Sequence, residues 1–169
     1  MEFLEVIKRR RSTRIFLKKT IEEEKLKEIL ENTNLAPSAH NWQSYKIYVI
    51  KNQIIKDKLT ESTRGQSYIS EAPIVLVFTS LPNSQYGDHP RRDFYSLQDA
   101  TIACYQAWLA AVNWGLSAVW IGAFEDQKVK EILNLSKNES PVAILPIGYS
   151  AKSLEPTPRK SLTEIIVEI

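Results

Sequence analysis

Residues 10–14, RRSTR, concentrate fixed positive charge and a hydroxyl group within five positions. The guanidinium groups of Arg10, Arg11 and Arg14 match phosphate oxygens bidentately, and the Ser12 hydroxyl adds a directional hydrogen bond. Two other interpretations compete with a phosphate site. The cations can complement the negative pole of a helix that ends here, or they can contact nucleic acid. The nucleic-acid alternative is weak, because no aromatic residues for base stacking alternate with the arginines.

A second group of polar side chains lies in the stretch LAPSAHNWQSYKIYVI, residues 35–50. Between a helix-like and a strand-like segment it carries Pro37, Ser38, Asn41 and Gln43 beside a tryptophan. A connection needs turn residues, but it does not need this combination of hydroxyl, amide and aromatic groups. Amide and hydroxyl groups suit the edge of a flat heterocycle, and apolar rings suit its face.

Arg159 and Lys160 add a second cationic pair near the other end of the chain. A phosphate held by arginines at one end and a ring held by amides at the other describe a nucleotide-like cofactor.

Other kinds of site lack their motifs. The chain contains no GxGxxG turn, no GxxxxGK[ST] loop and no GxSxG elbow, so a Rossmann site, a P-loop and a hydrolase elbow are unsupported. His40 and His89 lie far apart, with no cysteine or carboxylate at ligand spacing, and we expect no metal site. Cys104 falls in an apolar segment and is expected to be a small buried hydrophobe. We therefore expect no side chain to act as a nucleophile.

Length and composition indicate one globular domain over residues 1–169, since the chain has a mass of 19.4 kDa and 43% hydrophobic residues. The net charge of +2 is too mild to indicate a nucleic-acid partner by itself. The stretch MEFLEVIKRRRS lacks the apolar core of a signal peptide, and no later stretch approaches a membrane span. We expect a soluble, cytoplasmic protein without a membrane partner.

Hydrophobic periodicity predicts the elements that position these groups. A capping box at Thr20 and Glu23 starts a helix that ends near Asn34, and another at Ser96 and Asp99 starts the longest helix. The other helices are expected over residues 3–9, 53–61 and 127–133 (the last after an Asp126 cap), and strands over 45–50, 74–80, 117–121 and 142–149.

The longest expected helix, LQDATIACYQAWLAAVNW, is apolar on most faces, which is typical of a core helix. With interspersed helices and strands, it favours an α+β domain whose sheet packs around a buried helix. We also expect Trp108, Trp114 and Trp120 in the core. The tail ends in LTEIIVEI, and its apolar residues should be covered, for example by a partner subunit.

The chain resembles the FMN-dependent nitroreductase family in its short, single-domain form. The resemblance rests on four blocks in family order: RRRSTRIF, LAPSAHNWQSYKIYVI, YSLQDATIACYQAWLAAVNWGLSAVWIGAF and PIGYSAKSLEPTPRKSL. It implies a mostly antiparallel sheet around a buried long helix, flanking helices and a C-terminal arm that extends to the partner subunit. It also implies a homodimer with FMN at the subunit interface, where both chains contact each cofactor.

The resemblance distributes the site residues along the cofactor. On its phosphate, ribityl and pyrimidine side it places Arg10, Arg11, Ser12, Arg14 and Arg159, with Lys160 in reserve. From the other subunit it brings Pro37, Ser38 and Asn41 to border the ring, and it places the backbone of Gly122 and Ala123 near the reactive ring nitrogen. Two questions stay open: which of Arg9 and Arg11 faces the flavin, and whether Gln43 contacts it or braces the loop.

The implied activity is a ping-pong oxidoreductase, in which NADH or NADPH reduces FMN and a nitroaromatic, quinone or similar acceptor is reduced in turn. Two alternatives remain: a flavin dehydrogenase or reductase specific for one metabolite, and a flavin-binding protein without turnover. Residues 85–95, QYGDHPRRDFY, are the expected wall of the acceptor pocket.

Overall fold

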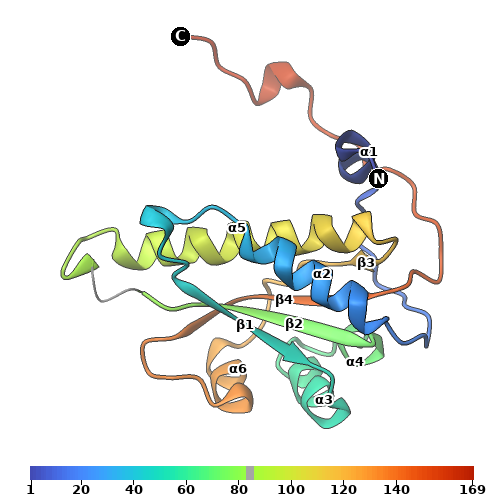
Figure 1. Cartoon of the computed structure of the whole chain (residues 1–169), viewed down its shortest axis with the longest axis horizontal. Coiled ribbons are helices and arrows are strands. Elements are labelled where there is room, and N and C mark those ends of the chain that lie inside the picture. The colour runs from blue at the N-terminus through green and yellow to red at the C-terminus, as the bar shows by residue number, and fades with distance from the viewer. Residues whose placement is uncertain (83–85) are drawn as a thin grey trace.

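A four-stranded antiparallel sheet lies at the centre of the computed structural model, which describes residues 1–82 and 86–169 (Figure 1). The strands lie side by side in the order β1-β2-β4-β3, and they span Tyr45–Ile50 (β1), Ile74–Ser80 (β2), Ser117–Ala118 (β3) and Ser140–Gly148 (β4). Gln85, at the start of the expected acceptor wall, lies outside the described residues.

Helices cover both faces of this sheet. They span Phe3–Arg9 (α1), Glu23–Asn34 (α2), Gln53–Glu61 (α3), Tyr68–Glu71 (α4), Arg92–Asn113 (α5) and Asp126–Leu133 (α6), with short 3-10 turns at Ala39–Asn41 (η1) and Leu162–Glu164 (η3). Figure 1 shows α2 and α5 on one face and α3, α4 and α6 on the other. Within residues 1–82 and 86–169, no helix combines the length with the hydropathy that crossing a bilayer requires.

Strand β2 builds the core on both faces. Leu76 and Phe78 belong to the apolar cluster that includes α2 and α5, whereas Val75 and Val77 belong to the cluster with α3, α4 and α6. Every residue of β2 is buried, because the strand is central and covered on both sides. The continuous apolar run therefore has a structural reason, and the strand predicted at residues 74–80 is confirmed.

Helix α5, with 22 residues, has two different sides. The side that faces the sheet includes four fully buried alanines, at positions 100, 103, 107 and 111, beside the larger buried residues Trp108 and Val112. The outward side carries Phe94, Ile102 and Tyr105, whose exposed fractions are 46%, 39% and 44%. The expected burial of this helix thus holds on the sheet side, and the outward side is apolar and uncovered in the single chain.

The expected helix caps are wrong. Helix α5 begins at Arg92, before Ser96, and the Ser96 hydroxyl donates to the Asp93 carbonyl oxygen at 2.9 Å. Asp99 does not cap a helix, because its carboxylate binds a neighbouring loop. Helix α2 follows Glu22 without a side-chain cap, and α6 begins at Asp126 itself, so that Glu125 occupies the cap position.

The strand expected at residues 117–121 is also shorter. Regular pairing in β3 covers Ser117 and Ala118, and the chain meets the sheet again at Ile121, which forms an isolated bridge with Ile144. Trp108 is buried as expected, whereas Trp114 is 37% exposed.

Residues 151–169, the C-terminal arm, leave the domain after β4 and are exposed throughout. The arm passes α1 and then runs away from the sheet (Figure 1). It presents apolar side chains to solvent: Leu162, Ile165, Ile166, Val167 and Ile169. The single chain therefore does not cover the apolar tail.

Candidate cofactor-binding site

The arginine-rich segment leaves α1 and runs along the edge of the sheet. Ser12 forms a bridge with Ala118 of β3, and the Thr13 N–H donates to the Ala118 carbonyl oxygen at 3.0 Å. Thr13 is buried, whereas Ser12 and Arg14 on either side of it are exposed. Because alternate residues of an extended segment share a face, Ser12 and Arg14 point to the same side.

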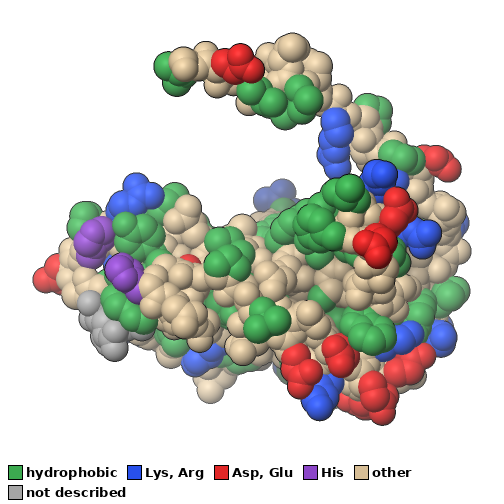
Figure 2. All heavy atoms as spheres, turned by 45° about the horizontal axis from the view of Figure 1, so that its top comes forward, with side chains coloured by type: hydrophobic (Ala, Val, Ile, Leu, Met, Phe, Trp, Pro, Cys, Tyr) green, Lys and Arg blue, Asp and Glu red, His purple; other side chains and the backbone are tan. Residues whose placement is uncertain are grey.

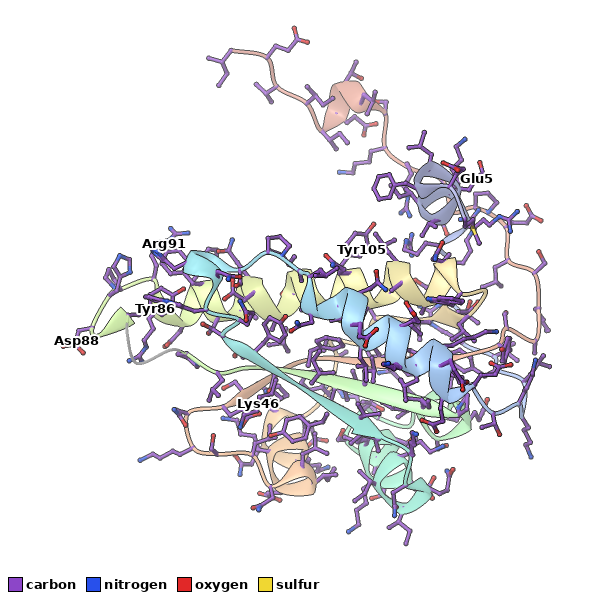
Figure 3. The ribbon with its side chains drawn as sticks, in the orientation of Figure 1. Glu5, Lys46, Tyr86, Asp88, Arg91 and Tyr105 are labelled. Carbon is purple, nitrogen blue, oxygen red and sulfur yellow. The ribbon has the colours of Figure 1, made fainter. Side chains whose placement is uncertain are left out.

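A cavity of about 950 Å³ lies where this segment meets α5 and the start of the arm. It is lined by Ile7, Lys8, Arg10, Arg11, Ser12, Arg14, Tyr105, Pro156, Thr157 and Arg159. Figure 3 shows Tyr105 on the side of α5 that faces away from the sheet. The structure therefore brings the four arginines and Ser12 predicted for the phosphate side into one cavity, which we call the arginine cavity, whereas Lys160 does not line it.

The four arginines of the arginine cavity are not paired with a described carboxylate, whereas Lys8 at its edge lies 3.6 Å from Glu5 (Nζ to Oε1). The cavity lining contains no carboxylate, and within the described residues Arg10, Arg11, Arg14 and Arg159 form no salt bridge. Burial lowers the pKa of Arg10; nearby Tyr105 opposes this shift, and the charges of Arg159 and Arg11 add to it. Like charges held together favour an anionic ligand, and guanidinium and hydroxyl donors fit a phosphate dianion.

Trp108 supports the Arg10 side chain. The guanidinium carbon of Arg10 lies 4.6 Å from the centre of the Trp108 ring, a cation–π arrangement. Trp108 is 6% exposed, so the face of a core tryptophan forms part of the floor beneath the cavity arginine.

Arg9 and Arg11 have different surroundings in the structure. Arg9 is exposed, its Nε lies 3.9 Å from Glu5 Oε2, and it does not line the cavity. Arg11 lines the cavity, and its Nη1 donates to the carbonyl oxygens of Lys8 and Arg10 at 2.5 Å and 2.9 Å. Arg11 therefore both caps the end of α1 and contributes charge to the cavity, whereas Arg9 faces solvent.

The 37–43 loop packs against a different part of α5 and is held by one buried carboxylate. Asp99 accepts hydrogen bonds from the Ala39 N–H at 2.9 Å and from the Ser44 N–H at 3.4 Å. Asp99 is 2% exposed and forms no salt bridge with a described residue. Burial and, to a smaller extent, the charge of Asp99 raise the pKa of Tyr45. Asp99 thus fastens both ends of the loop.

The backbone of the 37–43 loop is strained. His40, Asn41 and Gln43 have φ angles of 51°, 56° and 45°, in a region where residues other than glycine are uncommon. Gln43 stabilises this shape, since its Nε2 donates to Asn41 Oδ1 at 2.7 Å and its N–H donates to Ser38 Oγ at 3.0 Å. Gln43 braces the loop in the single chain, and Pro37 and Asn41 are exposed beside it.

Gly122 and Ala123 follow the bridge at Ile121 and are exposed. The Gln66 Nε2 donates to the Ala123 carbonyl oxygen at 3.2 Å. A Cβ at Gly122 would lie 3.2 Å from the Trp120 Nε1, tighter than an ordinary contact. The turn is therefore held from one side by a glutamine, and a larger residue at Gly122 would require the Trp120 side chain to shift.

The arginine cavity and the 37–43 loop lie apart in the single chain. Trp108 supports the first and Asp99 the second, nine positions apart on α5 (108 − 99 = 9), which is about 14 Å along the helix axis. Neither Pro37, Ser38 nor Asn41 lines the cavity, and neither do Gly122 and Ala123. One chain alone does not assemble all the predicted site residues around one point.

Sequence reasoning missed the roles of Asp99 and Gln66. An acidic residue within an apolar helical segment is a signal for a buried carboxylate with a specific partner, but the sequence also allows it to be read as a helix cap. Gln66 has no such signal, because its partner Ala123 is distant in sequence and contributes only a backbone oxygen.

This fold and site belong to a known class of proteins. The chain is a member of the nitroreductase family, because the sequence model described as Nitroreductase family matches residues 7–71 and 61–149. The match includes the arginine-rich segment, the 37–43 loop and α5. The resemblance inferred from the four sequence blocks is therefore confirmed.

Three similar proteins agree with this assignment. NADH dehydrogenase of Thermus thermophilus is 30% identical over 94% of this chain and 92% of its own length. FMN reductase (NAD(P)H) of Bacillus subtilis is 30% identical over 88% of this chain and 66% of its own length. The crystal structure of a nitroreductase family protein from Clostridium novyi matches with a TM-score of 0.83 and 31% identity, over 90% of this chain and 87% of that chain. The nitroreductase-like fold is thus confirmed.

Proposed function

We propose that the chain is an FMN-dependent oxidoreductase that passes electrons from NADH or NADPH to a small acceptor such as a nitroaromatic or a quinone. The observation that carries the proposal is the arginine cavity, whose lining has four arginines and no carboxylate. Membership of the nitroreductase family supports it, as do two relatives named NADH dehydrogenase and FMN reductase (NAD(P)H).

The arginine cavity suits the terminal phosphate of FMN. Arg10, Arg14 and Arg159 supply guanidinium donors, and Ser12 supplies a hydroxyl on the same face as Arg14. A terminal phosphate ester carries close to two negative charges at neutral pH. The internal diphosphate of FAD has no such terminal dianion, so the charges favour FMN. Lys160 follows Arg159 in the arm and adds a further cation near the phosphate.

The ring end of the site is proposed to come from two chains. Pro37, Ser38 and Asn41 are exposed or half-buried on the strained 37–43 loop, and from there they border the flavin held by the partner. The backbone of Gly122 and Ala123 approaches the ring from the chain that holds the phosphate. This division explains why the two halves of the site lie apart in the single chain.

We further propose that the chain is a homodimer. Its uncovered apolar surfaces are the outward side of α5, the exposed residues Phe3 and Leu4 of α1, and the C-terminal arm. Large uncovered apolar surfaces mark interfaces, and obligate dimers bury more than about 2,000 Å². The arm is then expected to lie on the partner, and the dimer to be cytoplasmic.

When bound, FMN supplies the hydride and electron-transfer chemistry, and the protein supplies binding, orientation and charge stabilisation. Arg10 or Arg14, whichever does not bind the phosphate, is the cation proposed to stabilise negative charge on the pyrimidine side. Cys104 is not available as a nucleophile, because it is fully buried and burial raises the pKa of its thiol. NAD(P)H and the acceptor would use the same pocket in turn, which gives ping-pong kinetics.

The proposal is tested by cofactor binding and then by turnover. The purified protein should show a flavin spectrum or bind added FMN, and Arg14→Ala and Arg159→Ala should each weaken FMN binding roughly 10- to 150-fold, or about 1.5–3 kcal/mol. Arg9→Ala is the matched control, because Arg9 lies outside the cavity, and it should leave the affinity unchanged. A protein that takes up no FMN in titration would contradict the proposal.

Steady NAD(P)H consumption by the FMN-loaded protein separates an enzyme from a flavin-binding protein without turnover. A screen of acceptors then separates a broad reductase from one that serves a single metabolite.

A further inference from the structure

An array of aromatic rings lies beside the 37–43 loop and is not used by the cofactor contacts proposed above. The ring centres of His40 and Trp42 are 4.9 Å apart and stacked, and Trp42 meets Tyr86 edge-on at 4.3 Å. Tyr86 lies 5.4 Å from Tyr95, and Tyr95 stacks with His89 at 5.6 Å. We call these five residues the aromatic surface. They join the loop to the start of α5.

Packing alone does not account for the aromatic surface. Only Tyr86 is buried; Trp42 and Tyr95 are half-buried, and His40 and His89 are exposed. Rings that serve the core are covered, whereas here a stacked array keeps part of its area free. His40 is also held at a positive φ, so its ring position costs backbone strain. The array therefore keeps part of its ring area uncovered in the single chain.

Arg91 lies at the same surface with its charge unpaired. Its guanidinium carbon is 4.6 Å from the centre of the Phe94 ring and 5.6 Å from that of Tyr95. The backbone N–H of Arg91 donates to His89 Nδ1 at 3.1 Å, which holds the histidine ring beside Arg91. Within the described part of the chain, Arg91 forms no salt bridge, whereas its neighbour Arg92 pairs with Asp93 at 3.0 Å.

The figures place this charge beside the rings. In Figure 3, Arg91 and Tyr86 lie at the N-terminal end of α5, next to the 3-10 turn of the 37–43 loop, and Asp88 lies further out. Figure 2 shows both histidines at this end of the molecule, next to Lys or Arg side chains and hydrophobic side chains. A ligand that touches the rings is thus within the field of an unpaired cation.

We infer that the aromatic surface and Arg91 recognise the electron acceptor, and that the preferred acceptor is a flat aromatic compound with an anionic substituent. The ring of the acceptor packs against the uncovered area of the aromatic surface, and its carboxylate or similar group pairs with Arg91, which lies over Tyr95 of that surface. The inference rests on the proposed function, because that function places the flavin ring beside the 37–43 loop.

Two matched acceptors test the charge. 4-Nitrobenzoate and 4-nitrobenzamide have nearly the same shape and differ in charge. With either acceptor, the nitro group is reduced to a nitroso group and one water is released. The two electrons and one of the two protons come from NAD(P)H as a hydride equivalent, and the second proton comes from solvent. Arg91→Gln should lower kcat/KM for nitrobenzoate about tenfold or more, the loss of one charged hydrogen-bonded pair, and leave nitrobenzamide within about twofold of the parent.

Two further variants sharpen the result. Arg91→Lys keeps the charge without the planar fork and should give an intermediate value for nitrobenzoate. Arg92→Gln is the matched control, because Arg92 is already paired with Asp93, and it should change neither acceptor. Anaerobic reduction of the bound FMN by NAD(P)H is measured separately in each variant, because NAD(P)H is proposed to use the same pocket and its half-reaction must be distinguished from reduction of the acceptor.

Contrary outcomes are distinct. Equal losses in kcat/KM with both acceptors, or no loss with either, in Arg91→Gln would overturn the inference. So would a parent enzyme that turns over other acceptors but not nitrobenzoate. Binding of benzoate, which cannot be reduced, is followed by tryptophan fluorescence. It should be weakened in Arg91→Gln relative to benzamide, and this measurement is independent of turnover, so a failure of the proposed function is recognised separately.

Discussion

Asp99→Asn replaces one oxygen of the buried carboxylate that holds the 37–43 loop with an NH₂ group. The parent side chain accepts hydrogen bonds from the Ala39 N–H at 2.9 Å and from the Ser44 N–H at 3.4 Å. In the variant the amide oxygen can accept one of these bonds, and the NH₂ group faces the other N–H. One backbone donor is therefore left without an acceptor in a buried place.

The magnitude follows from these two contacts. A hydrogen bond to a charged group contributes about 1.5–3 kcal/mol, and the shorter contact to Ala39 accounts for most of it. The loop also holds His40, Asn41 and Gln43 at positive φ, each costing on the order of 1–3 kcal/mol. That strain favours release of the loop once the carboxylate contact is weakened. We expect a loss of about 1.5–3 kcal/mol in the free energy of unfolding, or about 3–12 °C in Tm for a chain of this size.

The assay combines thermal unfolding of the FMN-free protein with a titration of FMN. Because Pro37, Ser38 and Asn41 are proposed to border the flavin, the released loop should weaken FMN binding about tenfold or more. Asp93→Asn is the matched control, since Asp93 is exposed and pairs only with Arg92 among the charged residues described. If Asp99→Asn lowers Tm but leaves the FMN affinity unchanged, the loop does not hold the flavin; if neither quantity changes, the carboxylate does not hold the loop.

Two further predictions concern stability and assembly. Glu139 is 1% exposed and accepts hydrogen bonds from Thr79 at 2.6 Å, Tyr48 at 2.8 Å and Lys46 at 3.3 Å. Burial raises the pKa of the Glu139 carboxyl group, but these donors together hold that pKa below the ordinary value of 4.5. Its stabilisation is therefore complete above that value and lost as the pH falls through the lowered pKa. Glu139→Gln should cost about 1.5–3 kcal/mol at neutral pH and flatten the acid side of a Tm–pH profile, and an unchanged profile would show that the carboxylate is not stabilising. Deleting residues 162–169 should shift the protein toward monomer in sedimentation and weaken FMN retention together, whereas a deleted chain that stays dimeric and yellow would remove the arm from the interface.

The elements that could be predicted from sequence are those whose local residue pattern agrees with their packing in the fold. Strand β2 is apolar at every position because both faces are covered, so its bounds at Ile74 and Ser80 could be read directly. Helix α3 likewise begins at Gln53 after an Asn52 cap, where the side chain accepts from the Ile55 N–H. In both cases local chemistry and tertiary packing favour the same structure.

The features that sequence did not predict depend on distant partners. Asp99 binds backbone groups some sixty positions away, at Ala39 and Ser44, and nothing near it in sequence distinguishes that contact from a helix cap. Both the outward side and the buried side of α5 are apolar, although they carry different residues, so hydrophobicity alone cannot tell the core from an interface. The cluster of Arg10, Arg11, Ser12 and Arg14 could be predicted because these residues are neighbours in the sequence. That Arg159 lies beside them could be expected only from the family resemblance.

The distance along α5 between the arginine cavity and the 37–43 loop has a genetic consequence. In the proposed dimer, each flavin site takes its arginines from one chain and its loop from the other. A cell with two versions of the chain, one damaged at Arg14 and one at Asp99, would form mixed pairs in which both lesions fall on the same site. The other site of every mixed pair would be intact. Two versions that are each defective alone would then complement one another, whereas two lesions within the same half would not.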